Sequence, residues 1–202
     1  RFSTTSTNIK IGGAMIDLAI ALRRVIQALE KAGDQYIIVG SMAAGAWGVI
    51  RATRDVDIAA MVSLESLAQL VEDLSADDLY APILDIRRSV ENGGSFNVLH
   101  PSSGGKVDVF VCKYDNEFEN MRLKRRIRLE VLGVPAWVAS PEDVVLAKLK
   151  WRESSRSETQ WRDCIEIAST QVLDLEHMRQ WATHLQLDKD LEDLIVAVES
   201  NR

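Results

Sequence analysis

The amino-acid sequence predicts an α/β or α+β fold, in which a mixed β-sheet with flanking helices is followed by a C-terminal helical part. Short β-branched runs alternate with helical patterns up to about residue 139, and only helical patterns follow. The chain has 202 residues, of which 47% are apolar, enough for one sizeable core. We therefore expect a core over residues 1–139, with 1–13 flexible, and a helical region over 140–202.

The first half of the chain should hold a long helix and two short strands. Apolar residues at helical spacing predict a helix from Ala14 to Lys31 that stops at Gly33. The segments that follow are predicted to be a buried strand at 36–39, a short helix at 42–47, a second strand at 56–61, and a helix capped by Ser63 that runs to about residue 74.

The second half should open with a hairpin and close with helices. The expected elements are strands at 95–99 and 106–113 joined by a turn-rich linker, a short helix after Asn116, and strands at 127–132 and 135–138. Ser140-Pro141-Glu142-Asp143 is typical of a helix start, with a capping Ser, Pro at the first position and an acid three residues after the Ser. About four helical segments follow.

Composition narrows the class of protein. The net charge is −6, from 24 Lys+Arg and 30 Asp+Glu, which argues against a surface coated in basic charge. Residues 174–199 carry seven acids and two basic residues, so five of the six negative charges lie there. Cys112 and Cys164 are too few for a disulfide framework and favour a reduced, cytoplasmic protein. No apolar run reaches the ~20 residues that cross a bilayer, so no membrane association is expected.

Three acids carry the predicted chemistry. Asp55 and Asp57 are two residues apart on one strand, so their side chains project from the same face. Carboxylates that close repel unless a cation lies between them, and Mg²⁺ prefers such oxygen ligands together with substrate phosphates. Asp108 interrupts an apolar strand, where a carboxylate needs a partner. If the two strands are neighbours, the three acids suit a site for two metal ions.

A phosphate-binding turn is predicted beside these acids. Gly40-Ser41 follows the first strand and leads directly into a helix, so it can offer backbone N–H groups to a phosphate. A Gly-Ser turn or an Asp-x-Asp pair alone is usually structural. The combination at this spacing, with basic residues between, indicates a phosphate-binding turn beside a metal-binding acid pair.

On these residues the sequence resembles the nucleotidyltransferase superfamily, whose pattern is Gly-Ser or Gly-Gly, a short helix, Asp-x-Asp and a third Asp on a later strand. The resemblance is closer to the small bacterial branch related to AbiEii-type toxins, in which Arg-x-Thr-x precedes the acid pair. Here that motif reads Arg51-Ala52-Thr53-Arg54. The branch's later motifs correspond to Ser140-Pro141-Glu142-Asp143…Lys148 and Arg162-Asp163-Cys164-Ile165-Glu166.

The resemblance implies a role for each matching residue. Gly40 and Ser41 would hold the triphosphate, and Asp55, Asp57 and Asp108 would ligate Mg²⁺, with Asp108 also the general base. Further contacts to the nucleotide would come from Arg51, Arg54, Lys148 and Asp163. The reaction would be transfer of a nucleoside monophosphate from an NTP to a hydroxyl or phosphate of RNA such as tRNA, a protein or a small molecule.

The branch also implies that the transferase is the toxin of a toxin-antitoxin pair. Two alternatives to a transferase stay open. One is a non-catalytic protein of the same fold, acting as a binding module or antitoxin-like partner. The other is phosphodiester hydrolysis on the same metals.

A basic run could bind an RNA acceptor, or it could be a solvated helix or edge strand, which we favour slightly. Its members are Arg122, Lys124, Arg125, Arg126 and Arg128. His177 and His184 lie seven residues apart and are expected to be surface residues rather than a metal pair. The five tryptophans (Trp47, Trp137, Trp151, Trp161, Trp181) are expected to fill the core or gaps between helices, with stacking of Trp151 or Trp161 on a nucleobase as the alternative.

Overall fold

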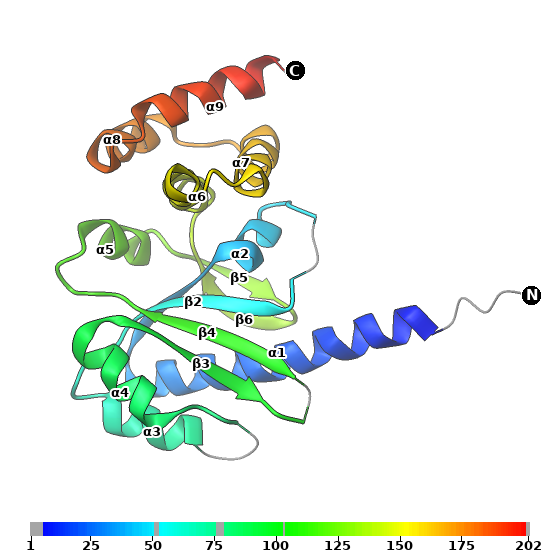
Figure 1. The fold of residues 1–202 in the computed structure, drawn as a ribbon, viewed down its shortest axis with the longest axis vertical. Helices are drawn as coiled ribbons and strands as arrows, with labels where there is room; N and C mark the ends of the chain where they lie inside the picture. Colours follow the sequence, from blue (N-terminus) through cyan, green and yellow to red (C-terminus); the bar gives the residue numbers. More distant parts are fainter. Residues whose placement is uncertain (1–5, 51–52, 76–78, 103, 201–202) are drawn as a thin grey trace, which may run out of the picture.

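A mixed sheet of six strands forms the centre of the computed structural model, which describes residues 6–50, 53–75, 79–102 and 104–200 (Figure 1). The strand order is β3-β4-β2-β1-β6-β5. The strands are β1 (Gln35–Val39), β2 (Asp55–Met61), β3 (Gly94–His100), β4 (Gly105–Val111), β5 (Ile127–Val131) and β6 (Val134–Val138). Strands β2 and β4 are parallel, as are β1 and β6, and the remaining neighbours are antiparallel.

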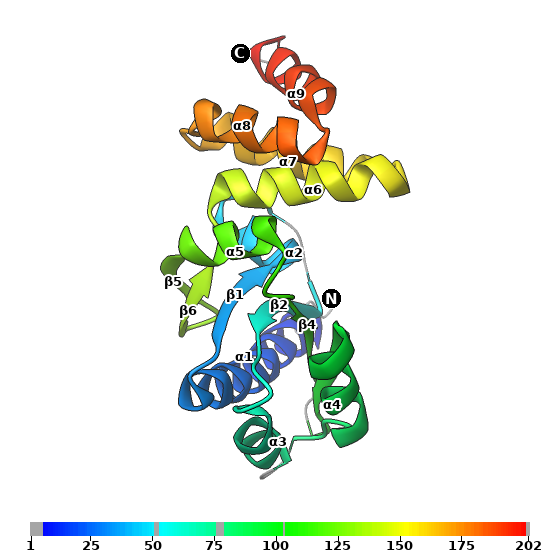
Figure 2. The same ribbon diagram turned by 90° about the vertical axis from the view of Figure 1, so that its left-hand side faces the viewer.

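Helices cover both faces of the sheet. The long α1 (Ser6–Ala32) crosses one face, with α3 (Leu67–Ser75) packed against it and α4 (Ile83–Asn92) against β3. On the other face lie α2 (Gly40–Ala46) and α5 (Glu117–Lys124) (Figure 2). A layer of four further helices is stacked over α2 and α5: α6 (Pro141–Ser155), α7 (Glu158–Thr170), α8 (Leu175–Leu185) and α9 (Asp188–Ser200). None of the helices in the described segments is long and apolar enough to cross a membrane.

The junction between the sheet and the last four helices is built from buried polar contacts. The Ser140 side chain accepts a hydrogen bond from the Asp143 backbone N–H, so the predicted helix start is confirmed. Asp143 is fully buried, and the His177 ring of α8 lies 3.1 Å from its Oδ1. Arg125, just after α5, pairs with Glu142 at 3.3 Å. The expectation of a surface histidine is therefore wrong for His177, because its side chain is only 11% exposed.

The predicted strands and the hairpin are confirmed, but three helices differ from the prediction. Helix α1 begins at Ser6, before the predicted start near Ala14. The prediction missed its first turns because they lack the apolar periodicity that marks a helix. Helix α3 begins at Leu67, since Ser63 caps a turn by accepting a hydrogen bond from the Ser66 N–H at 3.0 Å. Helix α4 was not predicted at all, and it buries little beyond Ile86 and Ser89.

Candidate active site

The sheet brings the three predicted acids together at one place. Asp57 of β2 and Asp108 of β4 are direct partners in the parallel register, and Asp55 pairs with Lys106 two positions earlier. Because side chains two residues apart share a face of a strand, all three carboxylates belong to the same face of the sheet. The condition on which the sequence argument depends, that these two strands are neighbours in the sheet, is therefore met.

The carboxylates repel one another in this arrangement. Burial, followed by the charges of Asp55 and Asp108, raises the pKa of Asp57 to about 6, and the ammonium groups of Lys106 and Lys148 offset part of that rise. Lys106 Nζ lies 2.7 Å from Asp108 Oδ2, so a lysine supplies the nearest positive charge to that acid. Excess negative charge at this point of the sheet is what a bound cation would relieve.

The first turn of α2 lies directly against Asp57. Gly40 has a φ of +63°, and a Cβ added there would lie 2.1 Å from Asp57 Oδ2. A side chain is thus excluded both by the left-handed backbone and by the carboxylate. Thr53, from the motif before β2, donates a hydrogen bond to Asp55 Oδ1 at 3.1 Å. Gly40 therefore allows the close approach of α2 to Asp57, and Thr53 positions Asp55.

Lys148 reaches the site from α6. Its Nζ lies 2.7 Å from Asp163 Oδ2 of α7 and 2.8 Å from Gln160 Oε1, and both members of the ion pair are nearly buried. Lys148 also acts electrostatically on Asp57. The structure thus joins Lys148 and Asp163, which are fifteen positions apart in the sequence, into one buried pair at the site. Gln160 was not predicted, since a glutamine at a helix start has no pattern that marks it.

A cavity of about 500 Å³ opens beside Asp57, between the sheet and α6. Gly40, Ser41, Asp57 and Lys148 line one part of it. The rest of the lining includes two aromatic side chains, Phe110 and Trp151, and three polar or charged ones, Asn116, Glu119 and Arg122. The cavity therefore combines a charged part beside the acids with an apolar part.

The remaining predicted residues are placed differently. Trp151 is 64% exposed and lines the cavity, so the expectation that it fills the core is wrong. Arg54 is exposed just before β2 and is not among the described residues that line the cavity. Arg51 lies outside the residues that the structure describes.

Most of the basic run is engaged within the protein. Arg122 is buried against Glu119 at 2.9 Å, and Arg125 pairs with Glu142. Arg128 pairs with Glu30 of α1 at 2.9 Å, and both Arg126 and Arg128 stack over Trp137. Lys124 is exposed. These contacts favour the structural interpretation of the run over five cations presented to an RNA.

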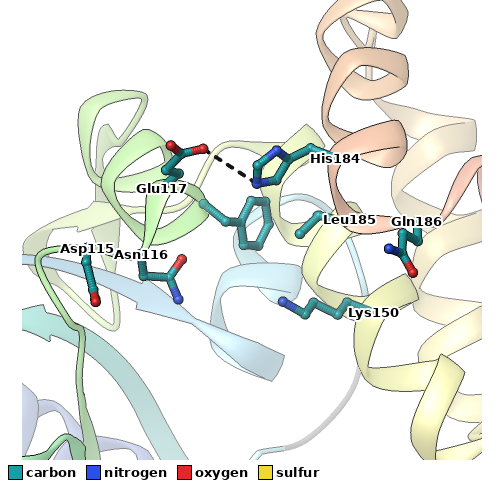
Figure 3. Close-up of a pocket in the computed structure, with 8 residues that line it drawn as sticks. Asp115, Asn116, Glu117, Lys150, His184, Leu185 and Gln186 are labelled. Carbon is teal, nitrogen blue, oxygen red and sulfur yellow. Dashed lines mark ion pairs between the residues drawn. The ribbon is translucent and has the colours of Figure 1, made fainter.

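A second hollow, of about 620 Å³, lies between α5 and the C-terminal helices (Figure 3). Asp115, Asn116 and Glu117 line it from one side, and Lys150 and His184 from the other. The Glu117 carboxylate and the His184 ring face each other at 3.6 Å. Asn116 lines both cavities, so the two are adjacent.

The carboxylate oxygens of the three acids are suitable ligands for a divalent cation, but their side chains are not close enough together to coordinate one in the described arrangement. Within the described segments, no three His, Cys, Asp or Glu side chains are close enough together to hold a metal ion. Asp108 Oδ1 is nevertheless buried without a hydrogen-bond partner. Three carboxylates on one face, one of them with an orphaned oxygen, match the oxygen ligands that Mg²⁺ prefers.

The class of protein is shown by a family model. Residues 17–197 match a family model described as "Nucleotidyltransferase of unknown function (DUF6036)". Because that match covers most of the chain, the protein belongs to this family. The match does not extend to the AbiEii-like branch, and membership of that branch stays a prediction.

Solved structures resemble the chain at low identity. A nucleotidyltransferase-like antigenic protein from Paracoccidioides brasiliensis is 19% identical, with a TM-score of 0.56 over 90% of this chain and 93% of that one. A putative nucleotidyltransferase from Thermotoga maritima is 18% identical, with a TM-score of 0.46 over 71% and 90%. ANT(2″)-Ia in complex with adenylyl-2″-tobramycin is 14% identical, with a TM-score of 0.47 over 91% and 97%. No curated protein matches the chain at a significant level.

Proposed function

We propose that this protein is a Mg²⁺-dependent nucleotidyltransferase that transfers a nucleoside monophosphate from an NTP to a hydroxyl or phosphate oxygen of an acceptor. The observation that carries the proposal is the pairing of Asp57 with Asp108 in adjacent parallel strands, beside Asp55. The pKa of Asp57, raised to about 6 by burial and by those two acids, supports a cation as the group that these carboxylates would bind.

Asp55, Asp57 and Asp108 are the residues that would hold the metal. When bound there, Mg²⁺ would supply charge neutralisation for the triphosphate and polarise the reacting oxygen. Gly40 and Ser41 line the cavity next to Asp57 and would contact the phosphates through their backbone N–H groups. Lys148, fixed by its buried pair with Asp163, would place a positive charge near the departing phosphates.

The reaction is an in-line displacement at the α-phosphorus. The acceptor oxygen forms a new bond to that phosphorus, and the bond to the oxygen bridging the α- and β-phosphates breaks, so pyrophosphate leaves with the electron pair. Asp108, the general base that the sequence resemblance implies, would take the proton of an attacking hydroxyl. The protein's contribution is mainly to position the substrates and to stabilise charge.

The acceptor classes are RNA such as tRNA, a protein, or a small molecule. If the acceptor is an essential RNA or protein, the activity would be toxic and a neutralising protein partner would be needed, as the sequence resemblance implies.

Label transfer tests the proposal. The protein is incubated with Mg²⁺, a total lysate and each α-labelled NTP in turn, and labelled macromolecules and small molecules are separated. We expect label to move from one NTP with the wild-type protein and with Asp85→Ala, an exposed acid on α4. Asp57→Ala should abolish transfer. Unchanged transfer by a folded Asp57→Ala protein would sink the proposal.

The same experiment separates the alternatives. A non-catalytic module would transfer no label from any NTP. A phosphodiesterase would also incorporate no label and form no pyrophosphate, but it would hydrolyse a labelled nucleic acid supplied in place of the labelled NTP. Thermal stabilisation by Mg²⁺ with NTP would reveal binding even where the acceptor is missing from the lysate.

A further inference from the structure

Two large aromatic side chains are left exposed inside the cavity beside Asp57. Phe110 is 44% exposed and Trp151 is 64% exposed, and both line this cavity. We infer that Phe110 and Trp151 form the nucleobase-binding part of the site, on which the base of the NTP stacks. The inference rests on the proposed function and extends it to residues outside the acid and phosphate motifs.

The strand places Phe110 correctly for this role. Phe110 follows Asp108 by two residues on β4, so both side chains lie on the same face of the sheet. Their separation along the strand is about 7 Å. An aromatic ring therefore lies about the length of a ribose from the acid beside which the α-phosphate would react.

On the opposite wall of the cavity, α6 also carries a charged residue followed by an aromatic one. Val144, Ala147, Lys148 and Trp151 all line the cavity, and their spacing of three, four and seven residues makes one face of α6. Trp151 lies one turn beyond Lys148, about 4.5 Å along the helix axis. On both walls, a charged residue of the proposed phosphate and metal site is followed at short range by an aromatic one.

The chemistry of this part of the cavity favours a planar ligand. Val144 and Ala147 add apolar surface to the wall of α6 that carries Trp151, while Asn116 and Glu119 supply polar groups elsewhere in the lining. Every nucleobase presents a π-face, and stacking on aromatic side chains is tolerant of base identity. Other tryptophans of the C-terminal region are covered by neighbours: Trp161 lies under Arg152 at 4.5 Å, and Trp181 packs on Phe118 at 5.7 Å. Trp151 is the one among these three that faces the cavity.

A pair of ligands isolates the contribution of the base. ATP and inorganic tripolyphosphate share the phosphates, but only ATP carries a base. Their dissociation constants are measured by calorimetry with Mg²⁺ for the wild-type protein, Phe110→Ala, Trp151→Ala and Trp151→Phe. Tyr114→Ala is the matched control, since Tyr114 is a 63% exposed aromatic residue just after β4 that does not line the cavity.

We expect Trp151→Ala and Phe110→Ala each to weaken ATP binding about tenfold or more, equivalent to about 1.4 kcal/mol. Tripolyphosphate binding should be unchanged, which also shows that each variant is folded. Trp151→Phe should keep most of the affinity for ATP, and Tyr114→Ala all of it. ATP, but not tripolyphosphate, should change the tryptophan fluorescence of the wild-type protein.

Three results would overturn the inference, and each has a different meaning. If ATP and tripolyphosphate bind the wild-type protein but neither alanine variant changes the ratio of their affinities, the base lies elsewhere. If both ligands are lost together in the variants, the two rings support the phosphate site and not a base. If neither ligand binds the wild-type protein, the proposed function itself fails.

Discussion

Replacing Asp57 by asparagine should make the metal-free protein more stable at alkaline pH. The folded structure raises the pKa of Asp57 from 3.8 to about 6, chiefly through burial and then through the charges of Asp55 and Asp108. At about 1.36 kcal/mol per unit, this shift corresponds to about 3 kcal/mol of penalty on the ionised form. Because Asp57 is only partly buried, solvent screening lowers the expected value to about 1–2 kcal/mol.

The sign of the effect follows from proton linkage. A raised folded-state pKa means that the folded protein binds the proton more tightly than the unfolded chain does. The penalty is therefore absent only well below the ordinary value of 3.8, at about pH 3 or lower, where the carboxyl is protonated in both states. It grows as the pH rises toward 6 and is complete above that value. An asparagine side chain cannot ionise, so the Asp57→Asn variant escapes the penalty.

Urea denaturation in EDTA, followed by circular dichroism at about pH 3 and about pH 8, measures the difference. Asp57→Asn should exceed the wild type in free energy of unfolding by about 1–2 kcal/mol at the higher pH and match it at the lower. Asp85→Asn controls for the loss of one surface charge. A difference that is the same at both pH values would refute the reasoning, as would a variant less stable than the wild type at the higher pH.

Two further predictions concern the residues around Asp57. Lys148→Met removes the ammonium that neutralises buried Asp163 and should lower the free energy of unfolding by about 3–5 kcal/mol, whereas Lys148→Met with Asp163→Leu should recover most of that loss in the same urea titration. Gly40→Ala would place a Cβ 2.1 Å from Asp57 Oδ2 and should abolish label transfer and lower the melting temperature. Gly45→Ala, whose Cβ would meet nothing within 4 Å, should leave transfer intact and stabilise the helix by up to about 1 kcal/mol. Equal behaviour of the two glycine variants would contradict the close approach of α2 to the acid.

The acid cluster could be predicted because its signals are local. The strand period of two places Asp55 and Asp57 on one face, and a carboxylate within the apolar run around Asp108 requires a partner. The parallel pairing that aligns Asp57 with Asp108 is a contact across about fifty positions of sequence, set by the order of strands in the sheet. From the sequence alone, the three acids can be said to converge only if these two strands are neighbours in the sheet.

The cavity wall on α6 could not be predicted from periodicity. Val144, Val145 and Leu146 are all buried, because α6 is packed between the core and the remaining C-terminal helices. A helix that is apolar on several sides has no single stripe to mark its inner face. The open face that carries Trp151 therefore emerges only from the packing of the whole layer.

The basic run at 122–128 shows that surface charge, too, could not be predicted from the sequence. Five cations within a short stretch suggest a binding patch, but the acids that pair with Arg125 and Arg128 come from α6 and α1. Those partners are distant in sequence and are brought close by the fold. Charge density along the chain therefore does not give the charge that the surface presents.

Paired labelling of ATP tests the central claim, nucleotidyl transfer at the Asp55, Asp57 and Asp108 site, most directly. With Mg²⁺ and the acceptor fraction, wild-type protein should move label from α-labelled ATP, or from whichever NTP proves active, and none from the γ-labelled form. One pyrophosphate should be released for each nucleotide incorporated, and Asp108→Asn should suppress both. Transfer of the γ-label, or incorporation that persists in folded Asp108→Asn protein, would contradict the account.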